Sequence, residues 1–319
     1  MQENVKKGYE AIIEYLYNVY YADSYEYSEV TSSHWKEIGG HEAALIDGAL
    51  NLKGTGFGGL IPGTFINRIV HFPESYLSAR MLDAYECPEF IRKKIFEVAD
   101  KSGRILNYVC VKQALPLKAV LSQLFGNNIP ESSPFLEAGI KTVCVIGDGY
   151  GCMGSLLKSI EPELKVVSVN LGRTLLFDVY YTRKVLPDLQ VGLITGEKSK
   201  RDASVSFMEA EKYELLREMP IDLFINIASM QEMNNSVISN YFRYMRSSSS
   251  HKKYFYCCNR VEKKLPDGET TRFIDYPWHK DDLILFDEIC PWYHKYPTSV
   301  PPFWKRFNGL LQHRFVELR

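Results

Sequence analysis

The sequence lacks several features that would at once define a class of protein. No window approaches the roughly 20 apolar residues of a membrane-spanning helix, and the N-terminus has no apolar signal-peptide core. Basic charge is not in excess, because the formal net charge is −1. A nucleic-acid surface requires concentrated basic charge, so we expect no nucleic-acid partner. These absences predict a cytoplasmic protein without membrane insertion.

Cysteine is sparse, and its spacing matches no metal or disulfide motif. The seven cysteines are odd in number and scattered, which argues against a disulfide framework. Cys257 and Cys258 are adjacent on an expected strand, so their side chains should point to opposite faces and cannot share a metal ion. We therefore expect buried free thiols in a reducing compartment, and no metal site.

The composition is that of an ordinary globular protein. With 319 residues, 45% hydrophobic and 24% charged, the chain has room for one large α/β domain and an appended domain. Residues 1–130 are predicted to form a mainly helical domain that supplies substrate contacts or the face of a homodimer. Its helical patterns lie at Tyr9–Tyr27, Ser78–Ala84, Pro88–Ser102 and Leu117–Phe125. The glycine-rich segment Gly54–Gly59 is either a lid or a connecting loop. Turn-forming residues at Gly126–Pro134 mark the boundary.

Residues 131–319 show a different sequence pattern, in which predicted strands and helices alternate. We expect strands at Thr142–Gly147, Val166–Asn170, Gln190–Ile194, Asp222–Ala228 and Tyr254–Cys258. Helices are expected at Met153–Ile160, Leu175–Val185 and Ser236–Arg246. His313–Leu318 could add an antiparallel edge strand. This alternation predicts a Rossmann-like α/β fold with a doubly wound, parallel sheet.

The segment Val143–Gly154 carries the strongest functional signal. A short apolar run ends in glycines at positions 147, 149, 151 and 154, and a helical pattern follows. Glycines at a strand-to-helix turn let the backbone bend and approach a ligand, and the helix directs unpaired N–H groups toward it. The segment therefore predicts a nucleotide-cofactor loop.

Two cofactors suit this loop. The spacing of Gly149, Gly151 and Gly154 fits the dinucleotide pattern G-x-G-x-x-G, which requires an acidic residue near the end of the second strand. The glycines at 147, 149 and 151 fit the S-adenosylmethionine pattern D/E-x-G-x-G-x-G, with Val145 at the acidic position. The ribose position falls near Asn170, whose amide accepts and donates hydrogen bonds without a charge. Asp148 could either contact the cofactor or complement the helix dipole.

Residues beyond the loop resemble the sugar O-methyltransferase family of the class I S-adenosylmethionine-dependent fold. The resemblance covers roughly residues 135–280 and is most specific at Asn226, at the block Ser229-Met230-x-Glu232-Met233 and at Asn259. It implies methyl transfer from S-adenosylmethionine to a sugar hydroxyl of a nucleotide sugar or surface glycan, in polysaccharide biosynthesis. Members of the family generally carry a carboxylate at the positions of Val145 and Asn170.

The expected cofactor site combines this resemblance with the rule that ligands bind at the carboxyl ends of parallel strands. Its residues are Gly147, Asp148, Gly149, Tyr150, Gly151, Asn170, Leu171, Thr195, Ser229 and Met230. Two residues are candidates for the group that accepts the hydroxyl proton. Glu232 follows the fourth strand, although it could instead cap a helix or pair with Arg260, and His279 lies in an aromatic turn. Further histidine candidates are His41 and His71.

Aromatic residues near the C-terminus are candidate sugar platforms, since ring faces pack on sugar C–H groups. They are Trp278, Trp292, Tyr293, Tyr296 and Trp304. The tyrosine-rich N-terminal helix is instead expected to contribute to a core or a dimer interface. Two other functions stay open. The glycine spacing also suits an NAD-dependent oxidoreductase, and the replaced carboxylates suit a non-catalytic protein of the methyltransferase fold.

Overall fold

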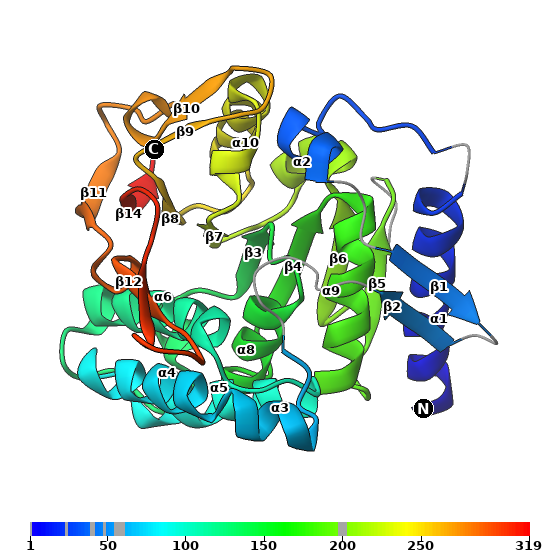
Figure 1. Cartoon of the computed structure of the whole chain (residues 1–319). Helices are drawn as coiled ribbons and strands as arrows, with labels where there is room; N and C mark the ends of the chain where they lie inside the picture. Colours follow the sequence, from blue (N-terminus) through cyan, green and yellow to red (C-terminus); the bar gives the residue numbers. More distant parts are fainter. Residues whose placement is uncertain (1, 23–24, 39–41, 47–48, 54–60, 197–202) are drawn as a thin grey trace.

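The computed structural model describes residues 2–22, 25–38, 42–46, 49–53, 61–196 and 203–319. Gly54–Gly59 and His41, two features of the sequence named above, lie outside these residues. The N-terminal part contains α1 (Gln2–Tyr20), α2 (Ser33–Ile38), α3 (Phe65–Val70), α4 (Phe72–Ala84), α5 (Glu89–Lys101), α6 (Tyr108–Phe125), α7 (Pro134–Glu137) and a hairpin of β1 (Glu42–Ile46) and β2 (Ala49–Lys53). Figure 1 shows α3 to α6 grouped below the central sheet, α1 at its β5 edge and α2 above the strands. None of the described helices combines the length and apolarity needed to cross a bilayer.

The central sheet has eight strands in the spatial order β11-β14-β8-β7-β3-β4-β6-β5. They are β3 (Thr142–Ile146), β4 (Lys165–Asn170), β5 (Val191–Ile194), β6 (Val205–Glu209), β7 (Leu223–Ile227), β8 (Lys253–Arg260), β11 (Leu283–Ile289) and β14 (Leu311–Leu318). Strands β3 to β8 pair in parallel, and β14 runs antiparallel to both of its neighbours. A parallel sheet with one reversed strand, β14, next to the edge strand β11 is a mixed sheet of the Rossmann-like α/β type. The predicted fold class is therefore confirmed.

The sheet departs from the sequence-based expectation at both ends. β6 was not predicted, and the expected third strand at Gln190–Ile194 is β5, the outermost strand. The predicted edge strand at His313–Leu318 is antiparallel as expected, but it lies between β8 and β11. Phe315 and Val316 explain this position, because both side chains are fully buried although they face opposite sides of the sheet.

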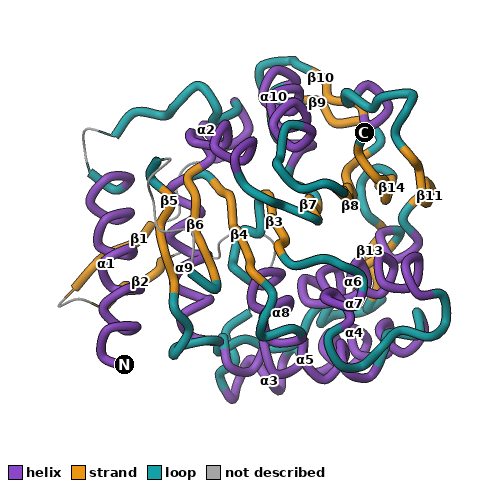
Figure 2. The backbone as a smooth tube through the Cα atoms, turned by 180° about the vertical axis from the view of Figure 1, so that it is seen from behind, coloured by secondary structure: helices purple, strands orange, loops and turns teal. Residues whose placement is uncertain are grey.

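Both faces of the sheet are covered, as its alternating side chains require. Val143 and Val145 face one core, formed with α8 (Cys152–Ile160), α9 (Gly172–Val185) and the N-terminal helices. Cys144 and Ile146 face a second core, formed with the 3-10 helix η1 (Ala210–Glu218) and α10 (Asn235–Arg246). In Figure 2, α10 lies near the top of the view and α8 near the bottom. The cysteines follow the same alternation: Cys257 lies in the second core and Cys258 in the first, as predicted, and all seven are free.

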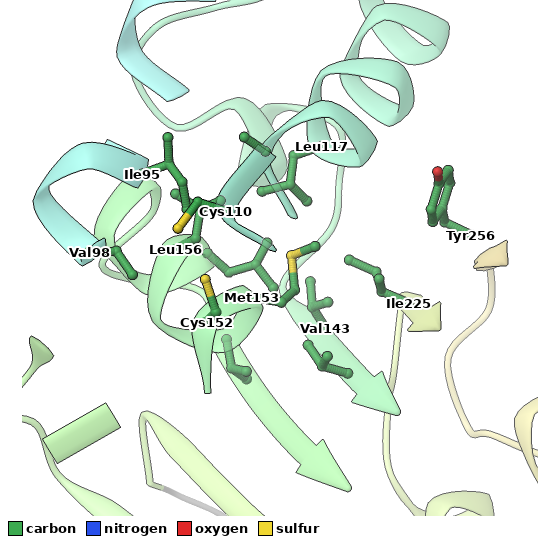
Figure 3. Close-up of a cluster of buried hydrophobic side chains, with 14 of the residues drawn as sticks. Ile95, Val98, Cys110, Leu117, Val143, Cys152, Met153, Leu156, Ile225 and Tyr256 are labelled. Carbon is green, nitrogen blue, oxygen red and sulfur yellow. The ribbon is translucent and has the colours of Figure 1, made fainter. Parts of the chain in front are cut away.

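The first core runs through both predicted domains. Val111 of α6, Leu156 of α8 and Val143 of β3 belong to one buried cluster, part of which Figure 3 shows. The helix α1 lies at the β5 edge of the sheet and packs on α9. Tyr9 and Tyr20 of α1 are buried in the same core. The division into residues 1–130 and 131–319 stays a prediction.

Shorter elements complete the C-terminal part. They are the 3-10 helices η2 (Met230–Glu232), η3 (Phe273–Asp275) and η4 (Pro291–Tyr293), the hairpin β9 (Glu262–Lys264) and β10 (Thr270–Arg272), and the hairpin β12 (Lys295–Pro297) and β13 (Trp304–Arg306). Two residues separate β7 from η2, and η2 contacts β8 and both strands of the β9–β10 hairpin. This connection brings polar side chains to the carboxyl ends of β7 and β8.

Candidate functional site

A cavity of about 230 Å³ lies at the carboxyl ends of the parallel strands. Residues that follow β3, β4, β6 and β7 line it, as expected for the ligand crevice of an open α/β sheet. They include Gly147, Asp148, Gly149, Tyr150, Asn170, Leu171, Ala210 and Ser229. We call this space the strand-end cavity. It contains seven of the ten residues predicted for cofactor binding.

Two glycines shape the turn after β3. Gly147 has φ +77°, and a Cβ atom placed there would lie 2.1 Å from Ser229 Oγ. Gly149 has φ +80°, but a Cβ atom there would meet nothing within 4 Å. Both positions favour glycine because L-residues rarely adopt such φ values. Gly147 therefore permits close packing of the loops after β3 and β7, and Gly149 leaves space in the cavity.

The side chain of Asp148 binds backbone groups at the start of α8. Its carboxylate accepts hydrogen bonds from the backbone N–H groups of Met153 at 3.0 Å and Gly154 at 2.8 Å. Burial raises the pKa of this carboxyl above its usual value, although these N–H groups favour the charged form. Of the two roles considered for Asp148, the hydrogen bonds favour the helix-terminus role.

Asn170 occupies the ribose position at the end of β4. Its Oδ1 accepts a hydrogen bond from Leu171 N at 3.0 Å, and its Nδ2 donates to Asp178 Oδ2 at 3.1 Å. Each end of the amide retains one further hydrogen-bonding site for a ligand. Asn170 is therefore oriented by the protein and lines the cavity with capacity left to bind.

Asp178 of α9 is a buried carboxylate that the sequence analysis missed. It accepts hydrogen bonds from Gly151 N at 3.1 Å, Ser168 Oγ at 2.9 Å and Asn170. Burial raises its pKa well above the usual value, and the nearby charge of Asp148 acts in the same direction. Asp178 thus connects the glycine turn to the end of β4. No motif marks it, since it lies two turns into a helix.

Two buried asparagines hold the connection between β7 and β8. Asn226 donates to Ile146 O at 2.8 Å and accepts from Met230 N at 3.1 Å, while Asn259 Nδ2 donates to Asn226 Oδ1 at 2.8 Å. Asn259 Oδ1 also accepts from Gln231 N at 3.0 Å. These side chains satisfy buried backbone groups. The two asparagines of the resembling block therefore fix the path of η2 beneath the cavity.

Glu232 lines the strand-end cavity at the end of η2. Its Oε1 accepts a hydrogen bond from Lys263 Nζ at 3.1 Å and lies 3.5 Å from His34 Nε2. Among the described residues, no hydrogen bond or ion pair involves Oε2. Its lysine partner is Lys263, and within the described part of the chain no ion pair joins Glu232 to Arg260, the partner considered from the sequence. Glu232 is thus held from one side, with its second oxygen available.

The N-terminal segment closes the strand-end cavity from the side opposite the sheet. Val30, Ser32 and Trp35 line it, and Ser32 Oγ donates to the backbone oxygen of Glu232. This segment follows α1, which carries the tyrosines that were expected in a core or dimer face. The sequence gives no local motif for this arrangement, because the contact joins residues that lie 200 positions apart.

The structure does not bring the remaining predicted residues into the cavity. Gly151 has φ +61° and packs beneath α9, where a Cβ atom would lie 2.5 Å from Thr182 Oγ1. Met230 is fully buried in the second core. Thr195 is exposed after β5, because the expected third strand is the outermost one. His279 is exposed in a turn where its N–H donates to Asp282 at 2.8 Å. His71 pairs with Glu74 at 3.2 Å, also outside this cavity.

A second cavity of about 400 Å³ adjoins the first. Lys112 and Val109 of α6, together with Ala228 and Gln231, line both spaces. Tyr293 and Tyr296, two of the proposed sugar platforms, line the second one, which we call the aromatic cavity. Trp278 packs instead on Phe255 in the second core. Lys112 was missed, since a single lysine in an apolar helix matches no motif.

Comparisons with known proteins give structural matches only. No protein-family model and no curated protein matches the chain. The mitomycin 7-O-methyltransferase MmcR is 10% identical over 66% of this chain and 57% of its own, with a TM-score of 0.37. The pyocyanin biosynthetic protein PhzM is 8% identical over 66% of this chain and 57% of its own, with a TM-score of 0.40. A SAM-dependent methyltransferase from Aquifex aeolicus is 10% identical over 65% of this chain and 98% of its own, with a TM-score of 0.37. The chain spans little more than half the length of the first two.

Proposed function

We propose that this protein transfers a methyl group from S-adenosylmethionine to a sugar hydroxyl. The observation that carries the proposal is the strand-end cavity, in which the glycine turn after β3 faces the end of β4 and the loop after β7. A nucleotide-containing cofactor binds at this position in open α/β sheets. The sugar comes from the resemblance of Asn226, the Ser229–Met233 block and Asn259 to the sugar O-methyltransferase family.

The strand order favours the methyl donor over a dinucleotide. Dinucleotide-binding sheets of the doubly wound type have the order 3-2-1-4-5-6 with parallel strands. Here β14 runs antiparallel between β8 and β11. The NAD-dependent oxidoreductase considered from the glycine spacing therefore fits the sheet less well. The acidic residue that a dinucleotide site needs is also replaced by Asn170.

The residues of the cavity fit S-adenosylmethionine. The open space at Gly149 admits a ligand against the backbone, and Asn170 has one donor and one acceptor left for vicinal hydroxyls. When bound, the cofactor would supply an electrophilic methyl group. The carboxylate of Asp148 is occupied by the start of α8 and supplies no contact in this proposal.

Glu232 is the proposed acceptor of the hydroxyl proton. Its Oε2 is available, while Lys263 and His34 hold Oε1 in place. A positioned carboxylate within hydrogen-bond reach of the acceptor hydroxyl removes its proton as the new bond forms. The segment around Ser32 and Trp35 covers the cavity and would limit the access of water. His279 has no role in this proposal, because it is exposed outside the cavity.

The proposal is tested by calorimetric titration of the full chain with S-adenosylhomocysteine and with NAD. We expect S-adenosylhomocysteine to bind and NAD not to bind. Binding of NAD alone would support the oxidoreductase. If neither binds at millimolar concentration, the non-catalytic alternative is favoured and the proposal fails.

Methyl transfer to a panel of sugars and sugar phosphates then tests the role of Glu232. Glu232→Gln should lower the rate about 100-fold, within the usual range for general base catalysis. Glu97→Gln is the matched control, because Glu97 also pairs with a lysine, Lys94 at 3.0 Å, but lies on α5 away from the cavity. Full activity of Glu232→Gln would show that another group takes the proton.

A further inference from the structure

The aromatic cavity differs in character from the strand-end cavity. Its walls come from the start of α6, the end of β8, η4 and the β12–β13 hairpin, and α6 lies beside β12 in Figure 1. The rings of Tyr108, Tyr296 and Phe307 form one contacting group, with centroid separations between 4.9 and 6.2 Å. Such rings offer flat apolar faces to a ligand.

Two cations line this aromatic space. They are Lys112 of α6 and Arg260 at the end of β8. Within the described part of the chain, the side chain of neither residue forms a hydrogen bond or an ion pair. Both residues are partly buried where they line the cavity. Removing a cation from water without a charged partner is unfavourable, and an anionic group of a ligand would supply the opposite charge.

The carboxylates near the cavity are already engaged. Glu74 also lines it, but its Oε2 accepts a hydrogen bond from Ser299 Oγ at 3.0 Å and lies 3.2 Å from His71 Nδ1. Glu232, on the side of the strand-end cavity, pairs with Lys263. The charged side chains that line the aromatic cavity are therefore Lys112 and Arg260, which have no partner among the described residues, and Glu74, which is bound by Ser299 and His71.

The environment of Lys112 agrees with this geometry. Burial lowers the pKa of its ammonium group below the usual value, while the charge of Glu232 acts in the opposite direction. An anionic group placed beside Lys112 would stabilise the ammonium form. Lys112 also lines both cavities, so a ligand group that it binds would lie next to the strand-end cavity.

We propose that the aromatic cavity binds the acceptor through a phosphate group, which Lys112 and Arg260 hold while the aromatic rings pack on the sugar. The acceptor is then a phosphorylated sugar, either a sugar phosphate or a nucleotide-activated sugar. Calling this ligand the methyl acceptor rests on the proposed function, but its binding through phosphate can be tested without the cofactor. Lysine and arginine are the usual ligands of phosphate groups, and aromatic rings suit the C–H faces of sugars.

The test measures binding of three probes to the full chain by calorimetry, in the absence of cofactor. The probes are glucose 1-phosphate, glucuronate and methyl α-glucoside, which share a ring and differ in charge. Glucose 1-phosphate should bind at least 10-fold more tightly than methyl α-glucoside. Equal affinity for the neutral and the phosphorylated sugar, or binding of neither, overturns the inference. Preference for glucuronate over glucose 1-phosphate also overturns it, because the anion recognised would then be a carboxylate.

Matched variants locate the site. Lys112→Met and Arg260→Met should each weaken binding of glucose 1-phosphate about 10- to 100-fold, the usual effect of losing a hydrogen bond to a charged group. Lys118→Met, on the same helix but outside the cavity, and Arg272→Met, on the exposed β10, should leave it unchanged. Loss of binding in the control variants, or none in Arg260→Met, contradicts the assignment. Circular dichroism of each variant checks that it is folded.

A second titration separates this inference from the proposed function. Of the two cavities described above, Arg260 lines the aromatic one and not the strand-end one, so Arg260→Met should bind S-adenosylhomocysteine as the unmodified chain does. Cofactor binding without phosphate binding overturns the inference and leaves the methyltransferase proposal in place. Phosphate binding that depends on Arg260, without cofactor binding, supports the phosphate site and contradicts the methyltransferase proposal.

Discussion

The glycine turn offers a sharp test of the site, because two glycines with nearly equal φ have different surroundings. Gly149→Ala adds a methyl group in open space, so its cost is the backbone strain of a positive φ, about 1–2 kcal/mol. Gly147→Ala has the same strain and also forces the new Cβ atom against Ser229, whose Oγ would be 2.1 Å away. Overpacking of this kind costs about 1–3 kcal/mol more.

These values convert into melting temperatures. An entropy of unfolding of about 2.1 cal/mol/K per residue implies about 1.5 °C per kcal/mol for a chain of 319 residues. Gly149→Ala should therefore lower the melting temperature by about 2–3 °C and Gly147→Ala by about 3–8 °C. Calorimetry measures both. Affinity for S-adenosylhomocysteine should respond most strongly to Gly149→Ala, because its methyl group enters the cavity, with a loss of about 10-fold or more.

A double variant isolates the contact itself. Removing the obstructing side chain by Ser229→Gly in the Gly147→Ala background should recover about 1–3 kcal/mol, the part of the loss caused by overlap. The same Ser229→Gly change beside Gly149→Ala should recover nothing. If Gly147→Ala were as stable as Gly149→Ala, or if Ser229→Gly rescued both equally, the close approach of the two loops would be refuted.

Two further predictions concern buried carboxyl groups. Asp178 has a raised pKa in the fold, so its contribution to stability is present at low pH and is lost as the pH rises from about 4 through the folded value. Asp178→Asn removes this titration. The difference in melting temperature between the unmodified chain and this variant should therefore become smaller as the pH rises from 4 to 8. If the difference stayed constant over this range, the assignment would be contradicted. Asp282 behaves oppositely: burial would raise its pKa, but hydrogen bonds from Arg246 and two backbone N–H groups hold the pKa below its usual value. Asp282→Asn should cost about 3 kcal/mol at pH 7 and should leave cofactor affinity unchanged. The difference should shrink progressively as the pH falls below about 4 and through the lowered folded pKa; a loss of stability that stays constant down to the lowest pH at which the chain is folded would count against this explanation.

Local patterns predicted the frame of the fold well. The apolar run at Val143–Ile146 and the glycines after it were sufficient to place β3, its turn and α8, because each signal lies within a dozen residues. The alternation of strands and helices likewise predicted the parallel sheet. β6 was missed, as its five residues, Val205–Glu209, carry a weak pattern. The predicted third strand therefore corresponds to the outermost strand, β5, and Thr195 after it lies outside the strand-end cavity.

The parts of the site that depend on distant contacts could not be predicted. Asp178 reaches the glycine turn from a helix, and Ser32 reaches Glu232 across 200 positions. Lys112 lines both cavities only because α6 packs beside the ends of β7 and β8. In each case the residue type is common in its local setting, and only the tertiary arrangement gives it a role.

The position of α1 has a consequence for the synthesis of the protein. Tyr9 donates to Leu186 O and Tyr20 to Glu209, partners that lie 177 and 189 positions later in the chain. At about 5–20 residues per second, a ribosome needs about 10–40 s to make those partners. During that interval the apolar face of α1 has no sheet edge to cover it. α1 is therefore made early and docks late, so its apolar face stays uncovered in the nascent chain until those partners have been made.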